Sequence, residues 1–308
     1  MRPRPTRRSL LRSLVLVLVG AAAGACSDAR PTEDAAAQGT PLVVASIFPG
    51  GDLARFMGGE DVRVDVLLPA RASPSTNEPT ARQMALLSGA AAYVFVGGGM
   101  DRWGERLVQP GDPVLRLIDG MELLEGHAHE GDPGTGNPHV WLDPILVRDQ
   151  VLPKIERVLV DAAPAHADAI GARRRALADS LTALDAEIRS ALQGVPSRAF
   201  VSTHSAWTYY ANRYGLVEIG AVYESPGREP SARHLAELVD SSRAQGVRAV
   251  FIEPQLGEAG ARTIASELGV EVHLLDPQGG PGVEGRDSYL SLMRFNTAEM
   301  VAGLGGKP

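Results

Sequence analysis

The sequence predicts an α/β protein of two lobes, each built on a mainly parallel β-sheet flanked by helices, with one long helix joining them. Short apolar runs rich in β-branched residues alternate with helical stretches, first in the amino-terminal half and again in the carboxy-terminal half. Such alternation is typical of parallel sheets. A long proline-free segment separates the two series and predicts the joining helix.

Each series contains four predicted strands. The first four lie at 42–47, 62–68, 92–96 and 114–118. The second four lie at 199–202, 217–222, 249–252 and 270–275. Helices are expected between several of these strands, at 81–87, 231–244 and 258–268, and a final helix at 288–304. The predicted lobes are therefore residues 41–163 and 196–308.

The joining helix is predicted at 164–195. Pro164 suits the first turn of a helix. Apolar residues then recur at steps of three and four, at Leu177, Leu181, Leu184, Ile188 and Leu192, and this spacing marks one buried stripe. The stretch from Pro164 to Leu192 has 29 residues and would be about 43 Å long as a helix. We expect it to act as a stiff strut that limits hinge motion between the lobes.

The first 26 residues have the features of an export signal. A basic head of five arginines is followed by a short apolar run and by small residues that lead to Cys26. We interpret residues 1–26 as a lipoprotein signal peptide with Cys26 as the lipidated residue, and residues 27–40 as a flexible tether. A plain cleaved signal with an incidental cysteine is the alternative. The segment 6–12 also resembles a twin-arginine motif, so Sec and twin-arginine export both remain open.

Charge and cysteine content exclude several classes. The formal net charge is −7, although the signal contributes five arginines and no acidic residue, so the rest of the chain is more acidic. Such a surface disfavours binding to nucleic acid. Because Cys26 is the only cysteine, neither an internal disulfide nor a thiolate metal site can form. The chain has no P-loop sequence, so it does not carry a P-loop ATPase.

Four polar segments follow predicted strands. In open α/β sheets, ligands bind beyond the carboxyl ends of the strands, so these segments form the candidate site. They are Ser-Pro-Ser-Thr-Asn-Glu-Pro-Thr at 73–80, Asn-Pro-His-Val-Trp-Leu-Asp-Pro at 137–144, Ser-Thr-His-Ser-Ala-Trp at 202–207 and Leu-Leu-Asp-Pro at 274–277.

Segment 137–144 resembles the second metal-ligand motif of the ZnuA/TroA-like solute-binding proteins of bacterial ABC importers, and segment 202–206 resembles the third. Further short segments fall in the order of that family, at 229–231, 252–255, 275–277 and 293–296. The resemblance implies extracytoplasmic capture of a divalent ion, Zn²⁺ before Mn²⁺, in the crevice between two lobes. It also implies delivery to an ABC permease in the cytoplasmic membrane by a monomeric protein that is not an enzyme.

The resemblance further implies His139 and His204 as imidazole ligands and Asp276 as a carboxylate ligand. Imidazole suits Zn²⁺, and a carboxylate suits both Zn²⁺ and Mn²⁺. A histidine at the position of His204 is similar to the zinc-type members. Glu253 follows an apolar strand and either orients a ligand histidine or serves as a helix cap or ion-pair partner.

The first motif departs from the family, whose pattern is Ser-Pro-His-x-x-Glu-Pro, because Ser75 stands at the histidine position. Three hypotheses follow: water or Glu78 completes the site, a nearby loop supplies a ligand, or the protein binds something else. The candidate loop is 126–132. Its His127 and His129 would replace the missing ligand, capture metal transiently, or lie solvated at the surface.

Two other functions remain open. A zinc hydrolase would use three protein ligands and a water, with Glu78 as its only evident base, although the H-E-x-x-H pattern is absent. A non-metal solute-binding or adhesion protein on the same scaffold would bind no metal ion. Metal content and turnover together distinguish these functions from metal capture.

Overall fold

The computed structural model describes residues 39–125, 136–224 and 227–306. Residues 40–308 form one compact unit by their contacts. Cys26, His127 and His129 lie outside the described residues, as does the predicted signal peptide.

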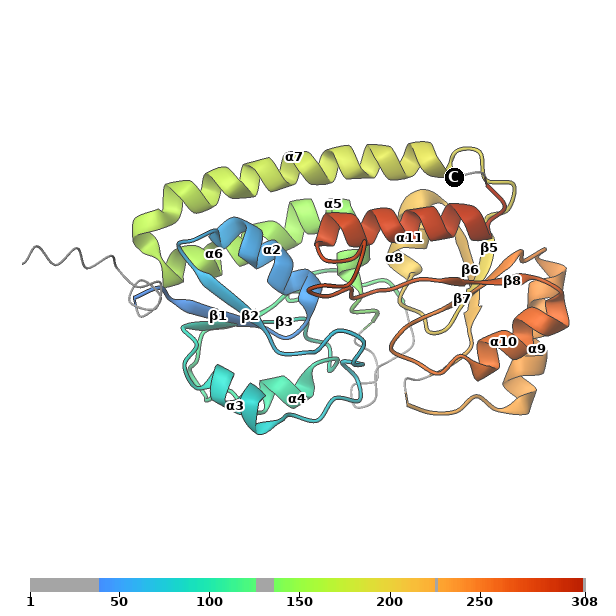
Figure 1. The fold of residues 1–308 in the computed structure, drawn as a ribbon, viewed down its shortest axis with the longest axis horizontal. Helices are drawn as coiled ribbons and strands as arrows, with labels where there is room; N and C mark the ends of the chain where they lie inside the picture. The colour runs from blue at the N-terminus through green and yellow to red at the C-terminus, as the bar shows by residue number, and fades with distance from the viewer. Residues whose placement is uncertain (1–38, 126–135, 225–226, 307–308) are drawn as a thin grey trace, which may run out of the picture. The chain divides into compact units, whose positions relative to one another are not determined.

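Two four-stranded parallel sheets form the framework (Figure 1). The strands of the first sheet are β1 Leu42–Ala45, β2 Arg63–Val66, β3 Ala92–Phe95 and β4 Val114–Arg116. Those of the second are β5 Ala199–Ser202, β6 Val217–Ala221, β7 Ala249–Ile252 and β8 Glu271–Leu274. The strand orders are β2-β1-β3-β4 and β6-β5-β7-β8, so the second sheet repeats the topology of the first. Every strand lies within its predicted range, and the predicted fold class is confirmed.

The central strands β1, β3, β5 and β7 are buried along their whole length, as expected for parallel sheets covered on both faces. Successive side chains of a strand point to opposite faces, and the cores follow this rule. Val43 and Phe200 belong to one core that both sheets share, whereas Val44 and Val201 belong to separate cores on the other faces.

Helices connect and cover the strands. They are α2 Phe48–Gly58, α3 Ala81–Leu87, α4 Arg102–Glu105, α5 Pro144–Leu146, α6 Leu152–Ala162, α7 Ala167–Leu192, α8 Thr208–Tyr214, α9 Ala232–Ala244, α10 Ala259–Leu268 and α11 Tyr289–Gly303. Short 3₁₀ turns lie at Val140–Leu142 and Pro164–His166, and a π-helical segment lies at Val147–Val151. Among the described residues, no helix combines the length and the apolar character that crossing a membrane requires.

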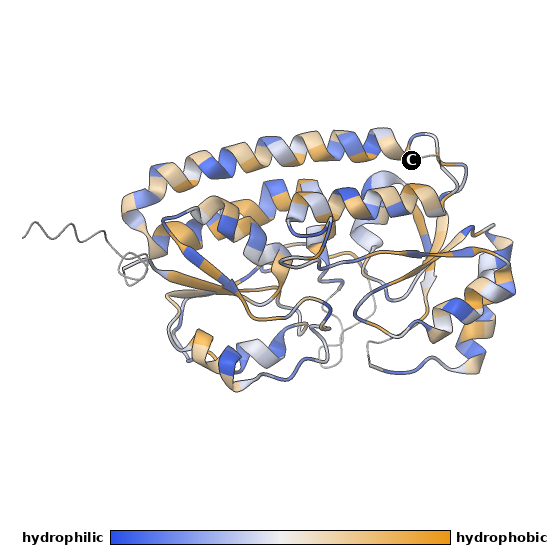
Figure 2. Cartoon of the chain, in the orientation of Figure 1, coloured by the Kyte–Doolittle hydropathy of each residue, from blue (hydrophilic) through white to orange (hydrophobic). Residues whose placement is uncertain are grey.

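The long helix α7 packs against α2 and α6, which flank the first sheet, and against α11, which follows the second (Figure 1). Its predicted stripe is buried, with Leu181 and Leu184 fully inaccessible to solvent, and Figure 2 shows polar and apolar residues mixed along its length. The helix begins at Ala167 instead of Pro164, because Ala163 leaves the helical conformation and Pro164–His166 form a 3₁₀ turn. Its 26 residues still span about 39 Å.

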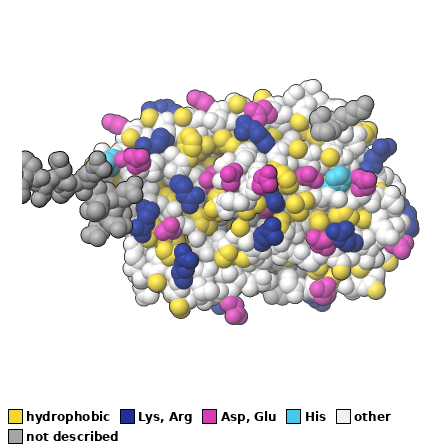
Figure 3. All heavy atoms as spheres, in the orientation of Figure 1, with side chains coloured by type: hydrophobic (Ala, Val, Ile, Leu, Met, Phe, Trp, Pro, Cys, Tyr) yellow, Lys and Arg dark blue, Asp and Glu magenta, His cyan; other side chains and the backbone are white. Residues whose placement is uncertain are grey.

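The face of the molecule drawn in Figure 3 carries acidic and basic side chains interspersed with one another. The described residues on this face therefore offer nucleic acid no continuous basic track.

Candidate metal-binding site

A small cavity lies between segments that precede α7 and segments that follow it. Its volume is about 20 Å³, which suits a single water-sized occupant. The indole Nε1 of Trp141 donates a hydrogen bond of 2.7 Å to the Pro277 carbonyl and ties the two sides together. The lining residues are Ser73, Pro74, Ser75, His139, Trp141, His204, Glu253, Gln255, Leu256, Pro277 and Gln278.

His139 is held in place by Asn137. The Asn137 Oδ1 atom lies 2.8 Å from His139 Nδ1 and accepts a 2.9 Å hydrogen bond from the His139 backbone N–H. Asn137 Nδ2 in turn donates to the Ser205 carbonyl at 2.7 Å and to Thr208 Oγ1 at 3.1 Å. Because Oδ1 only accepts, Nδ1 of His139 carries the proton and Nε2 presents its lone pair.

His204, which belongs to the second lobe, is held in place by Glu253 of the same lobe. Its Nδ1 atom lies 2.7 Å from Glu253 Oε2, and the Glu253 side chain is fully buried at the end of β7. Burial by itself lowers the pKa of His204, but the negative charge of Glu253 and the contact with it raise the pKa more, so the net pKa lies above its usual value. The carboxylate at Nδ1 directs Nε2 into the cavity.

The two rings meet at their inner nitrogens. His139 Nε2 and His204 Nε2 are 3.3 Å apart, and the rings lie edge to face. Two nitrogens on one tetrahedral Zn²⁺, with Zn–N distances of about 2.0–2.1 Å, would be separated by about 3.3–3.4 Å. The observed separation therefore fits two ligands of one zinc ion.

A second carboxylate lies behind His204. Glu218 of β6 accepts hydrogen bonds from Ser202 Oγ at 2.5 Å and from Thr208 Oγ1 at 3.1 Å. Burial raises the pKa of Glu218 to about 7, although both hydroxyls and His204 oppose the rise. In its ionised form Glu218 adds negative potential near His204, although it does not line the cavity.

Asp276 follows β8 and is buried, but it does not line the cavity. Its Oδ1 atom accepts from Gln255 Nε2 at 2.8 Å and from the backbone N–H groups of Gln278 and Gly279 at 3.0 Å each. Its Oδ2 atom pairs with Arg286 Nη1 at 3.0 Å. In the part of the chain that the structure describes, no three His, Cys, Asp or Glu side chains are arranged to share a metal ion.

The loop after Asp276 depends on one glycine. Gly279 has φ +66°, and a Cβ atom there would lie 2.5 Å from the Arg286 carbonyl oxygen. Glycine therefore lets the loop fold back so that Arg286 reaches Asp276. The Arg286 guanidinium also lies over the Phe295 ring, 4.6 Å from its centre.

The first-motif residues separate in the structure. Ser75, which stands at the position of the family histidine, lines the cavity, so this part of the first motif faces the site. Glu78 is exposed and is not part of the lining. Thr80 caps α3 through a reciprocal capping box with Gln83, so the end of this segment serves the helix.

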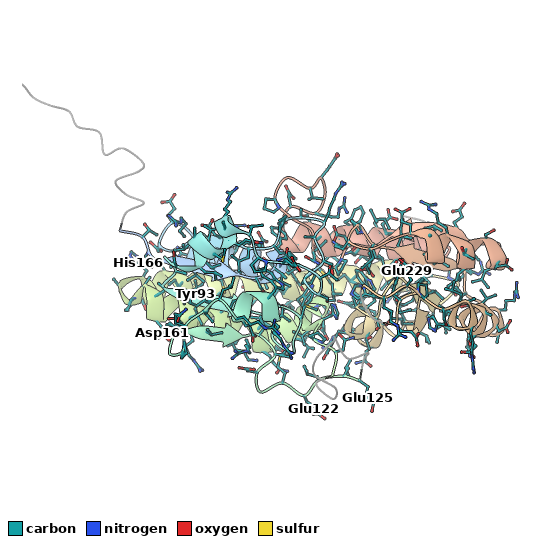
Figure 4. All side chains as sticks on the ribbon, turned by 90° about the horizontal axis from the view of Figure 1, so that it is seen from below. Tyr93, Glu122, Glu125, Asp161, His166 and Glu229 are labelled. Atoms are coloured by element: carbon teal, nitrogen blue, oxygen red, sulfur yellow. The ribbon has the colours of Figure 1, made fainter. Side chains whose placement is uncertain are left out.

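The segment that contains His127 and His129 lies outside the described residues, but the described residues that flank it, Leu124 and Asn137, are held close to His139. Asn137 N–H donates to the Leu124 carbonyl at 2.8 Å, and the Tyr209 hydroxyl donates to the Asn137 carbonyl at 2.8 Å. Figure 4 shows Glu122 and Glu125 at the outer edge of the stretch that leads into this segment.

Several site residues have no role assigned from the sequence. Asn137 and Gln255 lie in segments 137–144 and 252–255, which match the family, but the sequence assigns neither residue a role. Glu218 and Arg286 are not singled out from the sequence. Glu218 is detectable in principle, because it is the only charged residue in an otherwise apolar strand segment at 217–222, where a charge needs partners. Arg286 follows a glycine-rich stretch and has no such local signal.

Comparisons with known proteins agree with this architecture. The family model described as "Zinc-uptake complex component A periplasmic" (ZnuA) matches residues 43–303. The zinc-binding lipoprotein AdcA of Streptococcus pneumoniae serotype 4 is 27% identical over 276 residues, which cover 84% of this chain and 55% of AdcA. The chain thus spans about half the length of that relative.

Two further proteins match along most of their own length. The high-affinity zinc uptake system protein ZnuA of Bacillus subtilis is 26% identical over 289 residues, which cover 88% of this chain and 90% of the relative. A crystal structure of ZnuA is 31% identical with a TM-score of 0.76, covering 86% of this chain and 100% of the other. Because the family model matches both lobes, the chain belongs to the ZnuA family of periplasmic zinc-uptake components.

Proposed function

We propose that this protein captures a divalent metal ion outside the cytoplasmic membrane, Zn²⁺ before Mn²⁺, and delivers it to the permease of an ABC importer. The observation that carries the proposal is the 3.3 Å separation of His139 Nε2 and His204 Nε2, which matches two ligands on a tetrahedral zinc ion. The membership of the chain in the ZnuA family supports the same function.

The size of the cavity favours a bare ion over a larger ligand. Pockets for small organic ligands are commonly about 300–1,000 Å³, whereas this cavity is about 20 Å³. An organic ligand that needs a pocket of that size would not fit beside the two rings. We therefore propose binding without catalysis.

The two histidines are the proposed ligands, and their outer nitrogens are held by Asn137 and Glu253. Such supporting contacts set the tautomer and the direction of a ligand ring. Asp276 remains a predicted ligand, and its carboxylate is engaged by Arg286 and by three other donors. Ser75, which lines the cavity, or a water is the candidate for the position that the family fills with histidine.

Export and anchoring are proposed from the amino-terminal sequence. Residues 1–26 would direct export, and lipidated Cys26 would hold the monomer at the outer face of a membrane; AdcA, the relative described above, is itself named a lipoprotein. Replacing Cys26 by Ala should move the protein from the membrane fraction to the soluble extracytoplasmic fraction. Unchanged membrane association would argue against the lipid anchor.

The role of His127 and His129 is proposed to be transient capture of metal, because the described residues that flank their segment are held close to His139. The double substitution to Ala should then slow zinc uptake in rapid mixing while leaving the stoichiometry at equilibrium unchanged. A loss of equilibrium affinity would instead assign a ligand role to these residues. An unchanged uptake rate would leave them as surface residues.

The function is tested by elemental analysis and competitive metal titration of the apo protein without its signal. We expect one tightly bound Zn²⁺ per chain, weaker Mn²⁺ and no turnover of ester or peptide probes. His139→Ala and His204→Ala should each lower zinc affinity by more than the roughly 10- to 100-fold that loss of a supporting group costs. His166→Ala is the matched control, because His166 is half-exposed and pairs with Asp61 away from the cavity. A wild-type protein that binds no metal would refute the proposal.

A further inference from the structure

The side chain of Gln255 has one satisfied end and one unsatisfied end. Its Nε2 atom donates to Asp276 Oδ1 at 2.8 Å. Because an ionised carboxylate only accepts hydrogen bonds, the amide nitrogen must face Asp276, and the orientation of the amide is thereby fixed. The opposite atom, Oε1, is buried and has no hydrogen-bond partner among the described residues.

This unsatisfied oxygen belongs to a side chain that lines the cavity together with His139 and His204. Buried acceptors are normally paired, so an exception requires an explanation. A cation held by the two Nε2 atoms would supply the missing partner. An amide oxygen is a suitable ligand for divalent ions, and it is a harder donor than imidazole.

Asp276 is less suited to reach the metal. All four of its hydrogen-bonding contacts are already made, and it is absent from the cavity lining. Its backbone is also fixed, since Asn296 accepts from the Asp276 N–H and donates to its carbonyl at 2.8 Å each. Turning the carboxylate toward a metal would leave the partly buried Arg286 without its counter-ion.

Glu253 is also a poor candidate for the same position. Its carboxylate touches Nδ1 of His204, whereas the metal would lie at Nε2, on the other side of the ring. Gln278 also lines the cavity. Its Nε2 atom donates to the Ala72 carbonyl at 3.3 Å, and its Oε1 atom is not a buried atom without a partner. Glu253 Oε1 and Oε2 are also buried without a hydrogen-bond partner among the described residues, but their carboxylate lies against Nδ1 of His204. Gln255 Oε1 is the other unpartnered buried oxygen of the described lining residues, and it is not taken up by such a contact.

We propose that Gln255 Oε1 is a metal ligand of this site and that Asp276 acts by holding Gln255 in position, without touching the metal. The proposal rests on the metal-capture function proposed above. It gives the site two imidazoles and one neutral oxygen donor. Because an amide oxygen is a harder donor than imidazole, the preference for Zn²⁺ over Mn²⁺ should be narrower than in a site with three imidazoles.

The test is a double-mutant cycle measured by competitive zinc titration. Gln255→Ala should lower zinc affinity by more than the roughly 10- to 100-fold that loss of a supporting group costs. Asp276→Ala should also lower it in the wild-type background, but should have almost no further effect in the Gln255→Ala background, because its role passes through Gln255. Gln245→Ala is the control, because Gln245 is an exposed glutamine at the end of α9 and does not line the cavity, and this variant should stay within about twofold of wild type.

Two results would overturn the assignment. Either Gln255→Ala binds zinc as the wild type does, or Asp276→Ala costs a further tenfold or more in the Gln255→Ala background, as a direct ligand would. Because Asp276→Ala leaves Arg286 unpaired and the variant could fail to fold, a crystal structure of the zinc-loaded wild type provides an independent check. It should place Gln255 Oε1 about 2.0–2.2 Å from the ion, and Asp276 at that distance instead would refute the proposal.

The proposed function and the ligand assignment fail in distinguishable ways. A wild-type protein that binds neither Zn²⁺ nor Mn²⁺ refutes both. A wild type that binds zinc tightly while Gln255→Ala binds equally well refutes only the role of Gln255.

Discussion

His139 and His204 come from opposite sides of the long helix in the sequence, yet their Nε2 atoms lie 3.3 Å apart. Their outer nitrogens contact Asn137 and Glu253, so each ring is held from behind. An ion that enters between the inner nitrogens finds both rings already oriented, and little ordering remains to be done on binding. This arrangement is the basis of the following predictions.

Zinc affinity should depend on pH through His204. A proton and a zinc ion compete for its Nε2 atom, and metal binding requires the deprotonated nitrogen. Glu253 raises the pKa of His204 above its usual value. Zinc affinity should therefore be maximal at pH values above the raised pKa and should fall as the pH decreases through it. Competitive titrations between pH 5 and pH 8 would measure this profile, which should begin to fall above the ordinary histidine pKa of about 6.5.

Glu253→Gln provides the counterpart of that experiment. Without the negative charge the pKa of His204 should drop, so the decrease in affinity should begin at a lower pH, although the limiting affinity should be about 10- to 100-fold weaker. The exposed carboxylate Glu258, which pairs with Arg262, gives a matched control in Glu258→Gln. The same midpoint in both variants would contradict the proposed link between Glu253 and His204.

Ser75→His should strengthen zinc binding. Ser75 lines the cavity, so an imidazole at that position would add a third nitrogen donor. We expect an increase of at least about tenfold, equivalent to about 1.4 kcal/mol, together with stronger discrimination against Mn²⁺. Glu78→His, outside the lining, should have no such effect. If the Ser75 variant shows no gain, the first-motif segment does not present its side chain to the ion.

Asn137→Ala should weaken metal binding without removing a ligand. The substitution removes the acceptor at His139 Nδ1 and the donor to Ser205 and Thr208. Free rotation of the His139 ring should then cost about 10- to 100-fold in zinc affinity. Isothermal titration would measure the loss, with Asn212→Ala, an exposed substitution on α8, as the control. Equal affinities would show that packing alone orients His139.

Leu184→Ala should destabilise the whole folded unit. Leu184 is fully buried in the core that both sheets share, and removing a buried leucine side chain usually lowers the free energy of unfolding by about 2–5 kcal/mol. Urea denaturation should show one transition at lower urea for the variant and no change for Ser190→Ala on the exposed face of α7. Two separate transitions would contradict the role of α7 as a shared support.

The secondary structure was largely predictable because burial imposes simple patterns. A central strand in a parallel sheet is covered on both faces and is therefore a continuous apolar run, as at β7, where Ala-Val-Phe-Ile occupies its full length. The stripe of α7 repeats at three and four residues because one face of a helix packs. Both ends of that helix differed from the predicted range 164–195, since α7 runs from Ala167 to Leu192 and Ala163 has a non-helical conformation before the 3₁₀ turn.

The sequence was sufficient to predict which segments form the candidate site. It was not sufficient to predict which side chains in those segments contact one another. The sequence by itself places His139, His204 and Ser75 after strands, and parallel topology brings those strand ends together. The pairing of Asp276 with Arg286 and the orientation of Gln255 were decided by the tertiary structure alone. They depend on a loop that folds back through Gly279 and on charges that must find partners once they are buried, and neither condition leaves a periodic pattern in the chain.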